Sequence, residues 1–101
     1  GALTQYRRAL HVAFDLGKRE PLGGAVLALA RLQIDDTVQL NRVLQLLEAA
    51  ESVQPADSEV QRLLGRARTR QERLMRGGVT LPMVSSSLQD YAREAYEAPS
   101  S

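Results

Sequence analysis

The chain has 101 residues, a formal net charge of +1 and no cysteine. This length is typical of one domain with its own hydrophobic core, and the lack of cysteine excludes disulfides, thiolate metal sites and cysteine nucleophiles. Apolar residues make up 44% and charged residues 25% of the chain, as in a globular domain, and so small a net charge excludes a global field that attracts nucleic acid or a membrane surface.

The first predicted helix covers residues 4–16. Its apolar residues recur with the spacing of one helix face, at Tyr6, Ala9, Leu10, Ala13 and Phe14. Thr4 is the expected N-cap of this helix, and Gly17 is its expected stop signal.

A second helix is predicted from about Glu20 to Gln33. Pro21 falls in its first turn, where the missing N–H costs no hydrogen bond. The main apolar face consists of Leu22, Ala25, Val26, Leu29 and Ala30. Because Leu27 and Leu32 widen this face, we expect the helix to be buried on more than one side.

The third and fourth predicted helices have the clearest start signals. Residues 36–39 and 58–61 both have the pattern of a capping box, with Asp36 and Ser58 as the N-caps. Pro55 ends the third helix, and the two glycines at 77–78 end the fourth. The apolar positions follow the helical period at Leu40, Val43, Leu44, Leu47 and Ala50 in the third helix and at Val60, Leu63, Leu64, Ala67 and Leu74 in the fourth.

A fifth helix begins either near Pro82 or after Ser86, and residues 98–101 are expected to be disordered. Its helical period runs through Val84, Leu88, Tyr91, Ala92 and Ala95. No segment alternates like a strand, and the predicted links of about two to five residues favour antiparallel neighbours. We therefore predict a single all-α domain over residues 1–97, a small array of about five short antiparallel helices, either a closed bundle or stacked helical hairpins.

Charge is unevenly distributed along the chain. Residues 35–57 carry five acidic residues against one arginine, and residues 58–76 carry six arginines against two glutamates. On a helix, five of these arginines fall within about 120° of one another, opposite the apolar face. This arginine stripe consists of Arg62, Arg66, Arg70, Arg73 and Arg76. Such a stripe is either a solvated face with glutamate pairs or a surface for an anion: an acidic protein, the acidic third helix or nucleic acid.

Few residues offer catalytic chemistry. His11 lies one turn from Asp15, which could orient its imidazole, but no nucleophile or oxyanion pattern accompanies the pair. The serines at 85–87 lack the glycines of a nucleophile elbow. The two aspartates at 35–36 lack further oxygen ligands at the spacing of a cation-binding loop. We therefore expect no enzymatic activity, no cofactor and no metal.

The apolar residues exceed what one small core needs. The second and third helices are apolar over more than half of their circumference, so we expect Leu40, Leu46 and Val53 to contribute to a groove or a self-association surface.

These features together predict a non-enzymatic protein–protein interaction module, an adaptor or scaffold that forms a segment of a larger protein. The expected partner is an amphipathic helix, an acidic surface or a second copy of the chain. One alternative is a helical domain that associates with nucleic acid through the arginine stripe, and another is a structural segment whose apolar surface is a cut face. Because no secretion signal or membrane span is recognisable, an intracellular location, cytoplasmic or nuclear, is expected.

Overall fold

The structure, a computed structural model, describes residues 1–97 and contains five α-helices. They are α1 (Ala2–Leu16), α2 (Arg19–Gln33), α3 (Leu40–Val53), α4 (Ser58–Arg76) and α5 (Leu88–Glu97), and a 3₁₀ turn, Thr37–Gln39, leads into α3. No strand occurs within these residues. The predicted all-α class is therefore confirmed. The predicted disordered tail, residues 98–101, lies outside the described part of the chain.

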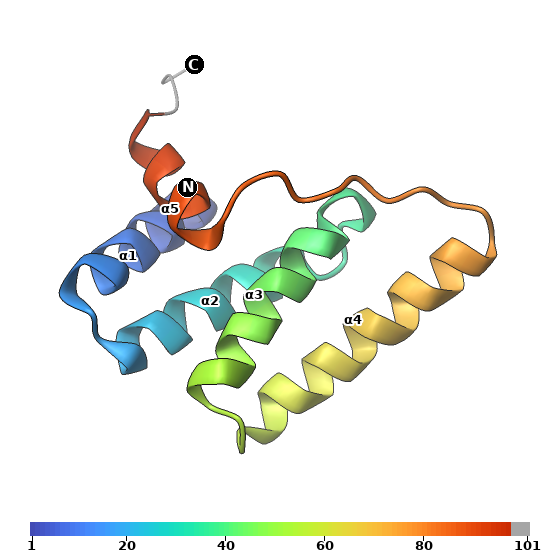
Figure 1. The fold of residues 1–101 in the computed structure, drawn as a ribbon, viewed down its shortest axis with the longest axis horizontal. Coiled ribbons are helices and arrows are strands. Elements are labelled where there is room, and N and C mark those ends of the chain that lie inside the picture. Colours follow the sequence, from blue (N-terminus) through green and yellow to red (C-terminus); the bar gives the residue numbers. More distant parts are fainter. Residues whose placement is uncertain (98–101) are drawn as a thin grey trace.

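The first four helices form a stack in which each helix packs against the next one along the chain (Figure 1). The molecule is flat, with extents of 40 × 38 × 21 Å. α5 does not continue the stack beside α4; it packs against α1 at the opposite end (Figure 1). α2 and α3 therefore lie in the interior of the array, and α4 and α5 form its two edges.

The connection between α4 and α5 is longer than the short links expected from the sequence. Residues 77–87, called the strap from here on, run past the N-terminal end of α3 without helical structure (Figure 1). Asn41 Nδ2 donates a hydrogen bond to Pro82 O over 2.9 Å, and Arg42 Nη1 donates to Ser86 O over 3.0 Å. Leu81 is the only buried side chain of the strap. This segment allows α5 to return to α1.

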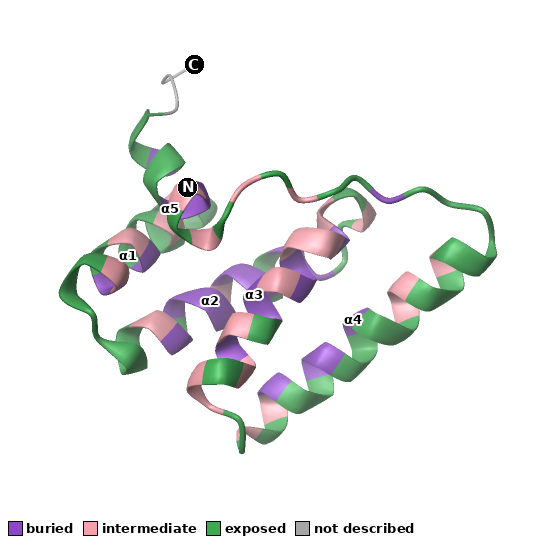
Figure 2. Ribbon diagram, viewed as in Figure 1, coloured by how far each residue is buried: buried purple, intermediate pink, exposed green. Residues whose placement is uncertain are grey.

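The core runs through the middle of the stack. Most of the buried residues lie on α2 and α3, whereas α4 is buried along one side only (Figure 2). Of the two residues expected to widen the buried face of α2, Leu27 is buried beside Leu29, but Leu32 is 49% exposed, so the expectation is met only in part. The largest fully buried side chains are Leu10, Val26, Leu29, Leu40, Val43, Leu46, Leu47, Val60 and Leu64.

Tyr91 holds α5 on the rest of the molecule. Its buried ring contacts the guanidinium groups of Arg7 and Arg42, whose Cζ atoms lie 4.2 and 4.4 Å from the ring centroid. Gln33 Nε2 donates to the Tyr91 hydroxyl over 3.1 Å, and Arg7 Nη2 donates to the Tyr91 carbonyl over 2.6 Å. Burial lowers the pKa of Arg42, because the charged guanidinium loses hydration there.

Two glycines end helices as the sequence indicates. Gly17 has φ +63°, and the N–H of Lys18 reaches back to Ala13 O over 3.2 Å, which closes α1 in a Schellman motif. Gly78 has φ +84° and ends α4 with the same geometry.

The start of α1 differs from the prediction, because the helix begins at Ala2 and Thr4 lies inside its first turn.

α4 begins with a different N-cap from the one predicted. Asp57 Oδ1 accepts hydrogen bonds from Glu59 N over 2.9 Å and from Val60 N over 3.1 Å. Ser58 is the first helical residue, so the prediction of Ser58 as the N-cap is wrong. Aspartate and serine are both strong N-caps, and the side chain that reaches two free N–H groups takes the position.

The starts of α3 and α5 agree better with the sequence. Asp36 accepts a hydrogen bond from Val38 N over 3.1 Å, as an N-cap does, but the turn that it begins is 3₁₀, and α3 starts only at Leu40. α5 follows the later of its two predicted starts, with Ser87 Oγ accepting from Asp90 N over 3.1 Å.

Candidate interaction surface

The arginine stripe lies on α4, the edge helix whose principal neighbour is α3. The apolar side of α4 faces the core through Val60, Leu63, Leu64 and Ala67. The stripe covers the opposite side and one flank, as the helical period predicts. Its five arginines share one helix, but their contacts divide them into two groups.

Arg66 and Arg70 bind the connection between α2 and α3. Arg70 Nη1 donates to Ile34 O over 2.6 Å, and its Nη2 donates to Thr37 Oγ1 over 2.6 Å. Arg66 Nη2 pairs with Asp35 Oδ1 at 2.7 Å. These two guanidinium groups therefore fasten α4 to residues 34–37. Asp35 belongs to the acidic segment 35–57, but it lies in this connection and precedes α3, the internal partner that the sequence suggested.

The other three stripe arginines are directed to solvent. The side chains of Arg62 and Arg76 are 65% and 73% exposed, and each lies near a glutamate of its own helix. Arg62 Nη2 is 3.9 Å from Glu59 Oε1, and Arg76 pairs with Glu72. Within residues 1–97, the Arg73 side chain has no hydrogen bond and no ion pair. Exposed pairs like these contribute little stability and leave the guanidinium groups accessible.

Glu59 is shared between Arg62 and α2. Arg31 donates two hydrogen bonds to it, from Nε to Oε1 over 2.8 Å and from Nη2 to Oε2. These bonds lower the pKa of Glu59 and raise the pKa of Arg31, because each stabilises the charged form of its partner. Since the folded state lowers the Glu59 pKa, the stability from this pair is present at neutral pH and is lost as the pH falls through the folded-state pKa.

The three apolar residues expected at a partner surface lie elsewhere. Leu40 and Leu46 are fully buried, so they belong to the core and not to an exposed groove. Val53 is half-buried at the end of α3, where its Cγ1 comes within 3.3 Å of a Cβ placed on Gly23. The apolar excess of α2 and α3 arises because helices on both sides cover them.

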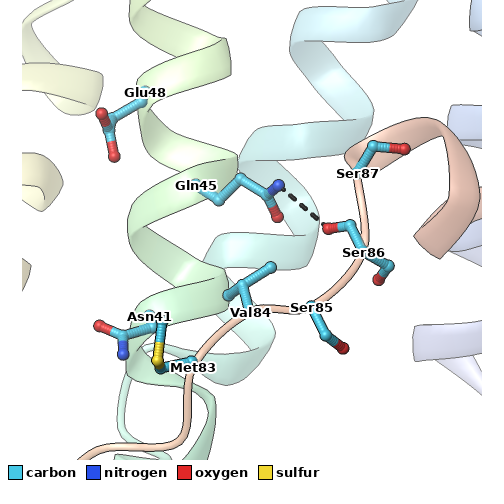
Figure 3. A pocket seen from close by; sticks show the side chains of 8 residues that line it. All are labelled: Asn41, Gln45, Glu48, Met83, Val84, Ser85, Ser86 and Ser87. Carbon is cyan, nitrogen blue, oxygen red and sulfur yellow. Dashed lines mark hydrogen bonds between the residues drawn. The ribbon is translucent and has the colours of Figure 1, made fainter.

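Two shallow hollows lie along the strap, and both are lined by Asn41 and Met83. The serine hollow, of about 440 Å³, lies between α3 and the strap, with Gln45 donating to Ser86 O over 3.3 Å (Figure 3). The methionine hollow, also about 440 Å³, lies between the strap and the end of α4. Its lining consists of Asn41, Gln71, Met75, Gly78, Val79, Thr80, Leu81 and Met83.

The methionine hollow was not predicted from the sequence, although the chain carries two signals of it. Residues 77–89 contain no charged side chain, which is unusual in a chain that is 25% charged. The only two methionines of the sequence, Met75 and Met83, flank the glycines at 77–78. Neither signal shows that the strap would bring the two methionines to one surface.

Within residues 1–97, the residues considered for catalysis lie on separate elements, with His11 and Asp15 on α1 and the serines at 85–87 in the strap. His11 Nε2 lies 3.3 Å from Asp15 Oδ2, and its ring meets the edge of Tyr96, with 5.1 Å between the centroids. The Ser86 hydroxyl accepts a hydrogen bond from Arg42, and the Ser87 hydroxyl accepts one from the backbone N–H of Asp90. In this part of the chain, no group of three or more histidine, aspartate or glutamate side chains is placed to hold a metal ion.

None of the helices in the described residues combines the length and the apolar character needed to cross a membrane. No protein-family model matches the chain, and no curated protein and no solved structure matches it.

Proposed function

We propose that this domain is a non-enzymatic protein–protein interaction module that binds an acidic protein surface through the outer face of α4. The observation that carries the proposal is the division of the arginine stripe. Arg66 and Arg70 are engaged inside the fold, whereas Arg62, Arg73 and Arg76 present guanidinium groups to solvent on an edge helix. Guanidinium groups bind carboxylates through charge-assisted hydrogen bonds, and arginine is enriched at protein interfaces.

The charge of this face favours a different protein over a second copy of the chain. A two-fold symmetric dimer through α4 would bring each arginine stripe against its own copy. Like charges placed opposite each other across an interface cost free energy and suppress that pairing. The same arginines attract an acidic surface on another protein.

Nucleic acid is a less suitable partner for this face. Two of the five stripe arginines are already bound to residues 34–37, which leaves three for phosphate contacts. The tyrosines lie on α1 and α5, at the other edge of the array, so the stripe offers no aromatic ring on which a base could stack.

A direct test measures binding of two labelled probes, a glutamate-rich synthetic peptide and a mixed-sequence DNA duplex, by fluorescence anisotropy. We expect the peptide to bind and its affinity to decrease with rising salt, because exposed charges are screened over about 8–10 Å. Replacing both Arg62 and Arg73 by glutamate should weaken peptide binding by about tenfold or more. Arg66 and Arg70 are unsuitable for this test, because their substitution would also release residues 34–37.

The matched control carries Lys18→Glu with Arg19→Glu, the same change in charge where α1 turns into α2, and of these two residues Arg19 gives up one exposed hydrogen bond to Ser52 O. This control should bind the peptide as the unmodified protein does. An equal loss of binding in both double variants would contradict the proposed surface. Preferential binding of the duplex, lost with Arg62→Glu and Arg73→Glu, would identify the module as a nucleic-acid-binding domain instead.

A further inference from the structure

We infer that the methionine hollow is the apolar anchor site for the same partner, and that this partner is an amphipathic segment with acidic residues beside its apolar ones. The inference rests on the proposed function and extends it from a charged surface to a specific docking site. It concerns residues at the end of α4 and in the strap, outside the arginine stripe.

Several large apolar side chains of the hollow are exposed to solvent. Met75 is 61% exposed and Met83 is 89% exposed, and Val79 between them is exposed as well. Leu81 lines the hollow and is buried, and the polar side chains that line it, Asn41 among them, carry no charge. Large exposed apolar side chains that gather at one place mark interaction sites. Methionine suits such a site, because its flexible thioether adapts to the shape of a partner.

Hydrogen bonds fix the strap and α4 relative to each other on the two sides of this hollow. Asn41 joins both walls, since its Nδ2 donates to Pro82 O over 2.9 Å and its Oδ1 accepts from Gln71 Nε2 over 2.9 Å. Met83 and Asn41 line the serine hollow as well (Figure 3), so the two hollows adjoin at these residues. A pre-formed site reduces the entropy that is lost when a partner binds.

The charges around the hollow select the occupant. Residues 68–83 carry four arginines and one glutamate, and that glutamate, Glu72, pairs with Arg76. Arg68 lies two helical turns before Met75 on the same side of α4, and within residues 1–97 its side chain has no ion pair. Four arginines against one glutamate give residues 68–83 a net charge of +3 beside this apolar hollow. That charge is complementary to a segment that combines apolar and acidic residues.

The test uses two synthetic helical peptides with identical glutamates, one with a leucine face and one with these leucines replaced by glutamine. We expect the leucine peptide to bind about tenfold more tightly, which corresponds to about 1.4 kcal/mol. Substitution of both methionines, Met75→Gln with Met83→Gln, should abolish this difference and leave binding of the glutamine peptide unchanged. The control is Leu16→Gln on α1, where the native side chain is 60% exposed, much like Met75. This control should keep the tenfold difference.

A second measurement reads the site directly. Because the sequence contains only two methionines, methionine methyl labelling gives two NMR signals, both from the hollow. The leucine peptide should shift both signals, and the glutamine peptide should shift them much less. Unshifted signals, or a leucine preference that persists without the methionines, would overturn the inference. In that case, binding that still depends on Arg62 and Arg73 would leave the proposed function intact, whereas loss of that dependence would refute the proposed function by itself.

Discussion

At the scale of single residues, the N-terminus of α4 shows how neighbouring candidates compete for one role. Asp57 and Ser58 are adjacent, and either side chain can accept hydrogen bonds from free N–H groups. Asp57 binds two of them, while Ser58 has entered the first helical turn. An aspartate at this position also interacts favourably with the positive end of the helix dipole, which a serine does not.

Asp57→Ala should therefore destabilise the domain by about 1–2 kcal/mol, because two backbone N–H groups of α4 lose their acceptor. Ser58→Ala should change the free energy of unfolding by less than about 0.5 kcal/mol, since Ser58 is exposed inside the first turn. Urea unfolding followed by circular dichroism measures both variants. If Ser58→Ala lowers the free energy of unfolding more than Asp57→Ala does, Asp57 is not the N-cap of α4.

At the scale of elements, α5 depends on side chains from distant parts of the chain. α1 contributes Arg7, α2 contributes Gln33 and α3 contributes Arg42, and all three contact Tyr91. Arg42 also fastens the strap, since its Nη2 donates to Ser86 Oγ over 2.7 Å. The strap and α5 are thus docked by a shared polar cluster as well as by apolar packing. Hydrogen bonds to a charged group contribute about 1.5–3 kcal/mol when they are well formed.

Arg42→Ala should loosen the strap and α5 together. The measurement is limited digestion with chymotrypsin, with mass spectrometry of cleavage at Leu81 and Met83, where we expect a several-fold faster rate. Arg93→Ala is the control, because Arg93 lies on the exposed side of α5 and pairs with Asp90 of the same helix. Equal cleavage rates in the two variants would show that Arg42 does not hold the strap.

At the scale of the whole molecule, the flat array makes stability uneven. α2 and α3 have neighbours on both sides, whereas α4 is packed mainly against α3 and α5 mainly against α1. Local opening is easiest where few buried apolar contacts are lost. An edge helix is also the natural place for a binding surface, because its outer side is free.

Native-state hydrogen exchange should therefore show the slowest amides in α2 and α3 and faster exchange in α4 and α5. The expected difference arises because α2 and α3 open only when the core around Leu29, Val43 and Leu47 is lost, and these three side chains are fully buried. Uniform protection across all five helices would contradict this arrangement. It would indicate that the edge helices unfold only together with the interior.

Much of the fold was predictable because local signals carry it. The period of the apolar residues locates the five helices, Gly17 and the glycines at 77–78 end two of them, and Asp36 marks the entry to α3. The candidate surface was predictable only in part. The period correctly places five arginines on one side of α4, but it does not show that Asp35, Thr37 and the carbonyl of Ile34 would bind two of them.

The sequence by itself determined which segments are helical and which side of each is apolar, because helix formation and amphipathicity depend on residues within a few positions of one another. Only the tertiary structure decided which side chains are buried, such as Leu46, and which helices become neighbours, such as α1 and α5. The physical reason is that these outcomes depend on contacts between residues far apart in the chain. The methionine hollow belongs to this second group, since it exists only where the strap passes the ends of α3 and α4.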